Sequence, residues 1–473
     1  NLLSIYLDAT FFPLLKKENF LQEGHRLDFA GNNLVRKGVV YNEMKGAMSS
    51  PDRVMVEAVK SNLFPTTTYR FNSGGDPKVI PELTHEGLKK FHSRYYHPSN
   101  AIFFLYGQID IDKVLTRIDS EVMDKFEYLD PKAEVPIEAT WTEAKAVDFD
   151  FAYTGDKSSQ KYQYAKNWLL CGIDNYEEAL GLEVVDELLL GHPGATLRAK
   201  LIESGLGSDL ADGSGINQES RSLSFGVGLK DIKKESIAQI DGIIQEELAR
   251  IIKNGFDKEE VEAVIRKKEL SVREFTNTPY PYGLQLWLEI ITPSLHGANP
   301  LEMLKFEKLL ASLQQKIKQG YLESLVEKYL INNTHRLDIT LVPNSNLAQE
   351  KEEAEKKELI SLLKTLSEKE KEEIKEQAQV LEKMQVEKED LSCLPSLEIK
   401  DIKKEIRKIA ISHQDNIIAI NQNTNGLFYT GFSIDLSRLR QDDLAMLPFL
   451  SYVLTKAGTK NLNYKELALE IQK

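Results

Sequence analysis

Hydrophobic positions in the first quarter of the chain recur at the spacing of amphipathic helices. Four segments show that spacing: 2–16, 38–48, 51–61 and 84–96. Ser50 is placed to cap the third helix, with Pro51 in its first turn, and Thr84 is placed to cap the fourth. Residues 64–83 are rich in Gly, Pro and Asn, which predicts a loop. The continuous apolar run AIFFLYG at 101–107 predicts a buried strand.

The middle of the chain mixes strand and helix patterns. Alternating or continuous apolar residues predict four strands: 146–153, 166–173, 222–230 and 336–343. Helical spacing predicts four helices: 176–190, 195–205, 231–253 and 257–275. Strands grouped with helices in this way favour an α+β layer over a doubly wound parallel sheet. The sequence contains no G-x-G-x-x-G and no G-x-x-x-x-G-K-[ST] phosphate loop.

Residues 346–390 are dense in Glu and Lys and carry a thin apolar stripe. A disordered segment and an exposed helical hairpin both fit that composition. The stripe favours the hairpin, and Ser367 is placed to cap its second helix. The residues of the stripe are Leu359, Leu362, Leu363, Leu366, Ile374, Ala378, Leu381 and Met384.

The last part of the chain, after Pro395, repeats the order of elements found in the middle. Strands are predicted at 408–413, 416–422 and 426–436, and helices follow at 443–458 and from about Tyr464. In both parts a strand, an acidic turn, a long helix, a break of small residues and a short helix follow one another. This recurrence predicts an internal duplication.

Composition and charge exclude several classes of function. The chain has 473 residues, 41% hydrophobic and 28% charged, as expected for a soluble protein of two or three domains. Its formal net charge of -13 argues against a nucleic-acid-binding protein, which would present a basic face. No apolar run reaches the roughly 18 residues that a membrane span needs. Cys171 and Cys393 are far apart and suggest no disulfide framework, so we expect a reducing compartment.

Both ends of the chain lie inside helical patterns. The sequence opens with NLLSIYL, without an initiator Met, and closes with LALEIQK. We therefore expect this chain to be an internal piece of a longer polypeptide.

One acid, Glu43, stands among apolar neighbours in the helix predicted at 38–48. A buried glutamate without a partner is costly, so it would need a cation, a hydrogen-bond network or a raised pKa. The alternative is that Glu43 lies on the solvated face of an amphipathic helix. This segment by itself leaves both interpretations open.

Other polar residues give weaker signals. His92 and His97 do not share a helix face, and His85 and His92 have no third ligand nearby, so we expect packing or surface roles for them. The Gly-Gly-Asp-Pro turn at 74–77 has backbone N–H groups that an anion could use, but a structural loop is the expected role. Cys171 lies in an apolar strand and is expected to be a core residue.

Four longer stretches carry a family resemblance: LLSIYLDATFFPLL, GVVYNEMKGAMSSPD, LFPTTTYRFNSGGDPKVIPELTHEGLKKFHSRYYHPSNAIFFLYG and HPGATLRAKLIESGLG. The third is the most specific, because both its length and its loop composition are unusual. Together they resemble the presequence-protease branch of the pitrilysin/insulinase superfamily of zinc metallopeptidases. The resemblance covers most of residues 1–345.

The resemblance implies a fold and a division of the chain. In that family, four related α+β domains form two halves, joined by a helical hairpin, around a chamber that holds peptide. The expected fold class is therefore α+β, with repeated metallopeptidase half-domains in which helices cover an antiparallel sheet. The expected parts are the C-terminal portion of the zinc-site domain (1–130), a linker (131–146), a second α+β domain (147–345), a helical hairpin linker (346–394) and the start of a third α+β domain (395–473).

The resemblance also implies a metal site to which this chain contributes one ligand. The family binds Zn²⁺ through an inverted motif, H-x-x-E-H, and through a distal ligand, the Glu of an N-E-M-K-G stretch. Here that Glu is Glu43. The sequence contains no H-x-x-E-H, so we expect the two His ligands and the general-base Glu upstream of Asn1, and no catalytic residue within this chain.

The implied function is that of a zinc metallo-endopeptidase that degrades short unstructured peptides, such as cleaved targeting peptides, in an enclosed chamber. This chain alone would be inactive. The alternative is a non-catalytic scaffold homologue of the same superfamily. We expect short unfolded peptides as partners, no nucleic acid, no membrane, and a monomeric full-length protein with two halves. The expected location is the bacterial cytoplasm, with an organelle matrix as the alternative.

Overall fold

The protein is described here by a computed structural model that covers residues 2–153, 155, 161–275, 280–387, 390–392, 394–402, 404–406 and 408–473. Cys393 lies outside these ranges. The chain forms two compact units, each assembled from three stretches of sequence. Unit 1 comprises Asn1–Ala47, Ser73–Glu134 and Lys351–Asn423, and unit 2 comprises Met48–Asn72, Val135–Glu350 and Thr424–Lys473.

Within the described residues, the core of unit 2 is a six-stranded sheet with the strand order β3–β8–β4–β7–β5 and with β6 also paired to β7. The β3–β8 pair is parallel and the other pairs are antiparallel. This sheet and its helices confirm the predicted α+β class. The strands are β3 (Lys145–Ala152), β4 (Tyr162–Gly172), β5 (Asp209–Leu210), β6 (Gly215–Asn217), β7 (Ser222–Ile232) and β8 (Arg336–Asn344).

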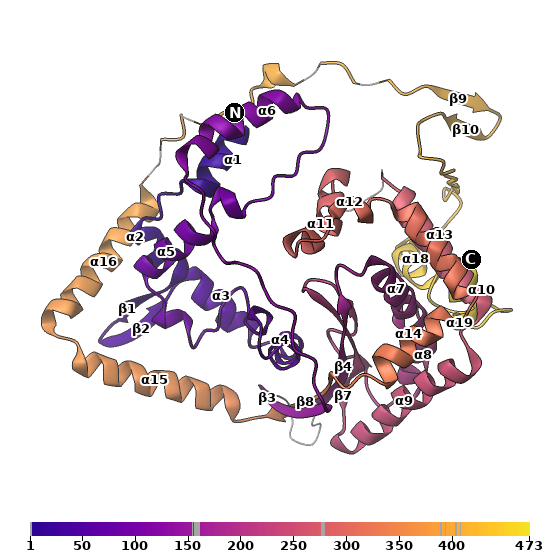
Figure 1. Ribbon diagram of the computed structural model, residues 1–473, viewed down its shortest axis with the longest axis horizontal. Helices are drawn as coiled ribbons and strands as arrows, with labels where there is room; N and C mark the ends of the chain where they lie inside the picture. Colours follow the sequence, from indigo (N-terminus) through magenta and orange to yellow (C-terminus); the bar gives the residue numbers. More distant parts are fainter. Residues whose placement is uncertain are drawn as a thin grey trace. The chain divides into compact units, whose positions relative to one another are not determined.

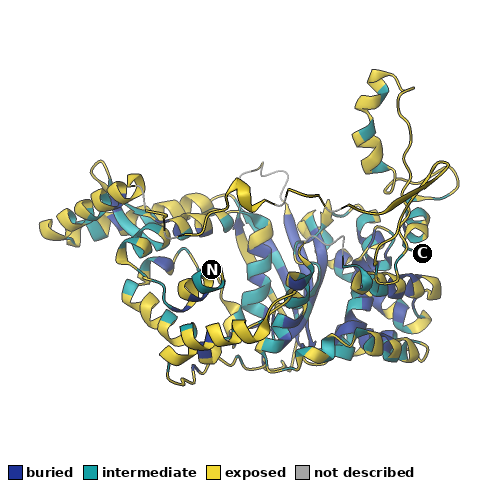
Figure 2. Ribbon diagram, turned by 90° about the horizontal axis from the view of Figure 1, so that it is seen from above, coloured by how far each residue is buried: buried dark blue, intermediate teal, exposed yellow. Residues whose placement is uncertain are grey.

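Helices cover both faces of this sheet (Figures 1 and 2). On one face, side chains such as Trp168 and Phe225 pack with the apolar sides of α7, α9, α10 and α14. On the other face, Leu337, Ile339 and Leu341 of β8 pack with α4. Successive residues of β4 contribute to opposite faces, as the period of a strand requires. The helices of unit 2 are α4 (Pro51–Leu63), α7 (Tyr176–Leu190), α8 (Thr196–Glu203), α9 (Ile237–Asn254), α10 (Lys258–Arg273), α11 (Tyr282–Leu295), α12 (Pro300–Met303), α13 (Phe306–Ile317), α14 (Tyr321–Val326), α17 (Gln441–Ala445), α18 (Leu447–Val453) and α19 (Tyr464–Gln472).

A buried charge stands inside this apolar layer. Lys166 of β4 has a side chain only 2% exposed, and its ammonium lies 2.7 Å from a carboxylate oxygen of Asp241 on α9 and 3.0 Å from one of Asp338 on β8. The hydroxyl of Tyr164 donates to the same two carboxylates, at 3.1 and 3.3 Å. The cluster therefore ties two strands and a covering helix together.

A second ionisable group of the core, Asp186 on α7, lacks such a cation in direct contact. Burial raises the pKa of the Asp186 carboxyl from its ordinary 3.8 to about 6, although the backbone N–H of Ile216 on β6 opposes the shift. Its Oδ1 atom is buried without a hydrogen-bond partner among the described residues. The raised pKa means that the folded state prefers the protonated form, so this group's contribution to stability is lost as the pH rises from about 4 through about 6.

We expect Asp186→Asn to stabilise the protein at neutral pH. Removing the buried charge should raise the free energy of unfolding by about 2–3 kcal/mol at pH 7.5, and the gain should fall towards zero as the pH approaches 4. Denaturant melts at a series of pH values measure this difference. Asp148→Asn, at an exposed position of β3, is the matched control and should change little at any pH. A gain from Asp186→Asn that did not vary with pH would contradict the assignment.

Unit 1 is built from helices and two short antiparallel β-hairpins. Helices α1 and α6 pack through a small cluster that contains Leu7, Phe11, Ile118 and Val122. The helices of unit 1 are α1 (Leu2–Phe11), α2 (Lys17–Asn19), α3 (Val39–Ala47), α5 (His85–Tyr95), α6 (Ile111–Glu121), α15 (Leu347–Thr365, whose first residues belong to unit 2) and α16 (Glu368–Val386). Its strands are β1 (Arg26–Ala30), β2 (Asn33–Lys37), β9 (Ile411–Gln414) and β10 (Ile417–Ile420).

The charged segment after residue 346 forms the predicted helical hairpin (Figure 1). Ser367 caps α16 as predicted, and it forms a reciprocal capping box with Glu370. The two most buried residues of the hairpin, Leu359 and Leu381, belong to the predicted apolar stripe. Thr84 likewise caps α5, where its hydroxyl accepts a hydrogen bond from the Gly87 N–H.

Several local predictions are wrong. Residues 101–107 and 426–436 form no strand, and Phe103 and Phe428 are exposed. A strand needs a neighbour for its backbone groups, and no strand among the described residues pairs with either segment. Ser50 occupies the position before α4, but its side chain makes no capping bond. The helix predicted at 443–458 is interrupted, and forms α17 and α18.

Of the helices in the described ranges, none combines the length and the hydrophobicity that a membrane crossing needs.

Candidate metal-ligand helix

The sequence GVVYNEMKGA forms α3, which starts directly after β2. Gly38 makes this junction possible, because its φ is +150° and a Cβ at this position would lie 2.2 Å from the carbonyl oxygen of Gly24. The helix ends near Gly46 and Ala47. A residue with a side chain at position 38 would force β2 and the segment at Gly24 apart.

The two faces of α3 have different surroundings. Tyr41 and Met44 are buried and pack with Val40 and Ile80. Glu43 lies about 200° around the helix from Tyr41 and is exposed. Within the described residues, no hydrogen bond or ion pair engages its carboxylate. A carboxylate oxygen is an ordinary ligand of zinc, so Glu43 fits one position of a zinc site.

The exposure of Glu43 corrects one argument from the sequence. An exposed carboxylate carries no desolvation cost, so the apolar neighbours of Glu43 do not require a cation to compensate it. The argument that a scaffold homologue would not keep an acid in so apolar a helix fails for the same reason. The assignment of Glu43 as a metal ligand therefore depends on the N-E-M-K-G resemblance and remains a proposal.

The opposite side of α3 is attached to the helical hairpin. The Tyr41 hydroxyl donates to Oε1 of Glu355 at 2.6 Å, and the Lys45 ammonium contacts Oε2 of the same carboxylate at 2.6 Å. One turn further along α15, Glu358 accepts two hydrogen bonds from the Arg36 guanidinium, at 2.6 and 3.2 Å. Sequence analysis missed these residues, because a Glu in a charged helix gives no signal of a partner some 310 residues away.

Ionisation states at this attachment follow from its geometry. Burial raises the pKa of the Tyr41 phenol to about 12, and the hydrogen bond to Glu355 adds to the shift. Burial would raise the pKa of the Glu355 carboxyl, but the hydrogen bonds from Lys45 and Tyr41 outweigh it and hold that pKa below its usual range. The Arg36 guanidinium lowers the pKa of Glu358. Both acids are therefore ionised and Tyr41 is neutral at physiological pH.

The histidines with weak sequence signals have packing roles. Nε2 of His85 lies 2.5 Å from the carbonyl oxygen of Leu15, and Nε2 of His92 lies 3.0 Å from that of Thr10. The ring of His97 accepts a hydrogen bond from a nearby backbone N–H. Among the described residues there is no group of three His, Cys, Asp or Glu side chains placed to hold a metal ion.

The loop with the most specific family resemblance is held by a buried carboxylate. Glu138, only 4% exposed, accepts hydrogen bonds from the backbone N–H groups of Thr66 and Thr67 and from the Thr66 hydroxyl. The His335 ring stacks on Trp141 and bonds to the chain just before this loop. Part of the segment predicted as a linker, residues 131–146, therefore packs into unit 2. The Gly-Gly-Asp-Pro turn closes through bonds of Asp76 to its own neighbours, as a structural loop.

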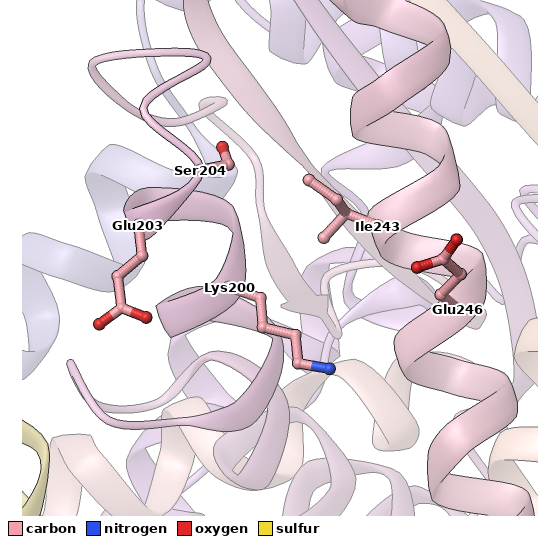
Figure 3. Close-up of a pocket in the computed structure, with 5 residues that line it drawn as sticks. All are labelled: Lys200, Glu203, Ser204, Ile243 and Glu246. Atoms are coloured by element: carbon pink, nitrogen blue, oxygen red, sulfur yellow. The ribbon is translucent and has the colours of Figure 1, made fainter.

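A surface hollow of about 340 Å³ lies between α8 and α9 (Figure 3). Two of its charged side chains already have partners: Lys200 contacts Glu247, and Glu203 contacts Tyr464 and Lys465. No histidine or cysteine lines it; the lining residues are Lys200, Glu203, Ser204, Ile243 and Glu246. It is therefore a poor candidate for a metal site.

Comparisons with known proteins agree with the fold and the motif. Two family models match the chain: "Peptidase M16 inactive domain" at residues 82–268, and the associated domain of subfamily C of the same peptidases at residues 341–473. The mitochondrial presequence protease of Mus musculus is 34% identical over 490 residues, which are 100% of this chain and 47% of that protein. Protein HypA of Clostridium perfringens is 32% identical over 99% of this chain and 49% of its own length. The chain thus spans about half the length of these relatives.

Solved structures support the fold alone. The peptidase M16 inactive domain from Pseudomonas fluorescens matches with a TM-score of 0.50 and 17% identity, over 64% of this chain and 68% of that one. The first half of the periplasmic protease PqqL from Escherichia coli matches with a TM-score of 0.50 and 16% identity, over 76% and 74%.

The helix-covered sheet and the N-E-M-K-G helix define an α+β unit of the peptidase M16 type. The chain belongs to the M16 peptidase family, and within it to the presequence-protease branch.

Proposed function

We propose that the full-length protein is a zinc metallo-endopeptidase that degrades short unstructured peptides. The observation that carries this proposal is the 31–34% identity, over 98–100% of the chain, to proteins named as presequence proteases. Because this chain spans only about half of those relatives, the activity is proposed for the full-length polypeptide. The chain alone is proposed to be inactive.

In this proposal Glu43 supplies one ligand of Zn²⁺, and two histidines and a general-base glutamate come from sequence outside the chain. Zinc bound in this way acidifies a water and polarises the scissile carbonyl. The part of Glu43 is to present one carboxylate oxygen from the solvent side of α3. The buried residues Tyr41 and Met44 hold the other side of that helix.

The proposed substrates are short peptides that enter an enclosed chamber, which a folded domain would be too large to enter. The net charge of -13 favours basic peptides electrostatically. Relatives are named as mitochondrial or chloroplastic and one comes from a bacterium. We propose the bacterial cytoplasm as the compartment, with an organelle matrix as the alternative.

The test is metal content and cleavage, measured on the full-length protein. We expect close to one zinc per polypeptide and cleavage of a fluorogenic, unstructured peptide. A chelator should abolish that cleavage, and added zinc should restore it. A folded protein that contains the same peptide sequence should stay intact. A full-length protein with neither zinc nor cleavage would support the scaffold alternative, and cleavage by the 473-residue chain alone would contradict the proposed mechanism.

A further inference from the structure

We propose that Glu355 and Glu358 of α15 are positioning residues for Glu43. They hold the far side of α3 and so fix the direction in which Glu43 presents its carboxylate. This inference rests on the proposed function and extends it, because it assigns to the helical hairpin a part in the metal site beyond that of a connector.

The first step is the identity of the partners. Glu355 receives one bond from Tyr41 and one from Lys45, which lie one turn apart on the same side of α3. Two bonds to one carboxylate fix both the position of the helix and its rotation about its own axis. Arg36 and Glu358 form a forked, bidentate pair on the strand that leads into α3, which restricts the entry to the helix as well.

The second step is the weakness of the other supports of α3. The helix has nine residues, and isolated helices of that length are marginal in water. Its buried side chains are Tyr41 and Met44, in a small cluster with Val40 and Ile80. Few apolar contacts therefore compete with the hairpin in setting the orientation of this helix.

The third step is the geometry of the two faces. The attached side of α3 and the side that carries Glu43 are nearly opposite, so the hairpin holds the helix without covering the carboxylate. Functional side chains need their supports to hold them within about 0.5 Å and 10–20°. A rotation of α3 would turn Glu43 by the same angle and move it away from the other ligands.

The experiment compares zinc affinity in variants of the full-length protein. The double variant Glu355→Gln with Glu358→Gln should weaken zinc binding about 10- to 100-fold, the range seen when partners that orient metal ligands are removed. Zinc affinity is measured by competition with a chromophoric chelator, and kcat and KM are measured alongside. With zinc below saturation we expect kcat to fall and KM to change little. The matched control is Glu352→Gln with Glu376→Gln, which removes two exposed acids of the same hairpin.

Two further variants separate this inference from a general effect on folding. Exchanging the charges with Lys45→Glu and Glu355→Lys should recover part of the affinity, since it restores an ion pair across the contact. Hydrogen exchange in the 473-residue chain should show faster exchange of the α3 amides in the Gln double variant than in the control.

The outcomes distinguish the two proposals. If Glu43→Gln loses zinc but the Glu355/Glu358 double variant binds it as tightly as the wild type, the positioning role is overturned and the proposed function stands. If Glu43→Gln keeps its zinc, both are overturned. Equal losses of zinc in the double variant and in the control pair would also overturn the positioning role.

Discussion

Glu43→Gln is expected to strip zinc from the full-length protein while leaving its fold intact. The loss should exceed the roughly 10- to 100-fold that follows removal of an orienting partner, because the change removes a ligand itself. An amide is neutral and is a poor substitute for a carboxylate on zinc. Since the side chain is exposed, its replacement should change the free energy of unfolding by no more than about 0.5 kcal/mol.

Zinc content after dialysis against a weak chelator measures this effect, and thermal melting of the metal-free protein measures the fold. Glu86→Gln, on an exposed face of α5, is the matched control and should retain zinc. Glu43→Asp keeps a carboxylate but shortens its reach, so its affinity should lie between those of the wild type and the Gln variant. Full zinc content in Glu43→Gln would remove Glu43 from the site.

Elements with strong local signals could be predicted from the sequence. The helix predicted at 176–190 is α7 to the residue, and its apolar positions form a large part of the main core. The alternation in β8 correctly separates Leu337, Ile339 and Leu341 from their polar neighbours. Ser367 and Thr84 cap their helices as predicted, because a cap depends on residues within one turn.

Features that depend on distant partners could not be predicted in this way. The run at 101–107 has the composition of a strand, yet no strand in the described part of the chain pairs with it. The apolar residues around Glu43 do not reveal which side of α3 faces solvent, since that is decided by packing against Ile80. The attachment of α3 to the hairpin joins residues about 310 positions apart. Lys166 could have been noticed, because a lysine in the middle of an apolar strand requires buried partners.

The charged cluster around Lys166 gives the largest stability effect that we expect in unit 2. In the β4–β8 register Lys166 lies directly opposite Asp338, and its ammonium also contacts Asp241. Removal of this cation leaves two carboxylates facing each other. The hydroxyl of Tyr164, which contacts both carboxylates, has one proton and can donate to only one of them at a time. Breaking a buried pair by removing one partner typically costs about 3–5 kcal/mol, whereas replacing the whole set by neutral groups can be nearly neutral.

We therefore expect Lys166→Met to lower the free energy of unfolding by about 3 kcal/mol, the lower end of that range, because both aspartates keep some contact with water. Adding Asp338→Asn to this variant should recover part of the loss, since it removes the repulsion between the carboxylates. Lys60→Met breaks a pair whose acid, Glu219, is 74% exposed, and should cost less than about 1 kcal/mol. Urea melts of the three variants measure these differences. If Lys60→Met and Lys166→Met cost the same, or if Asp338→Asn made the Met variant still less stable, the cluster would be an ordinary surface pair.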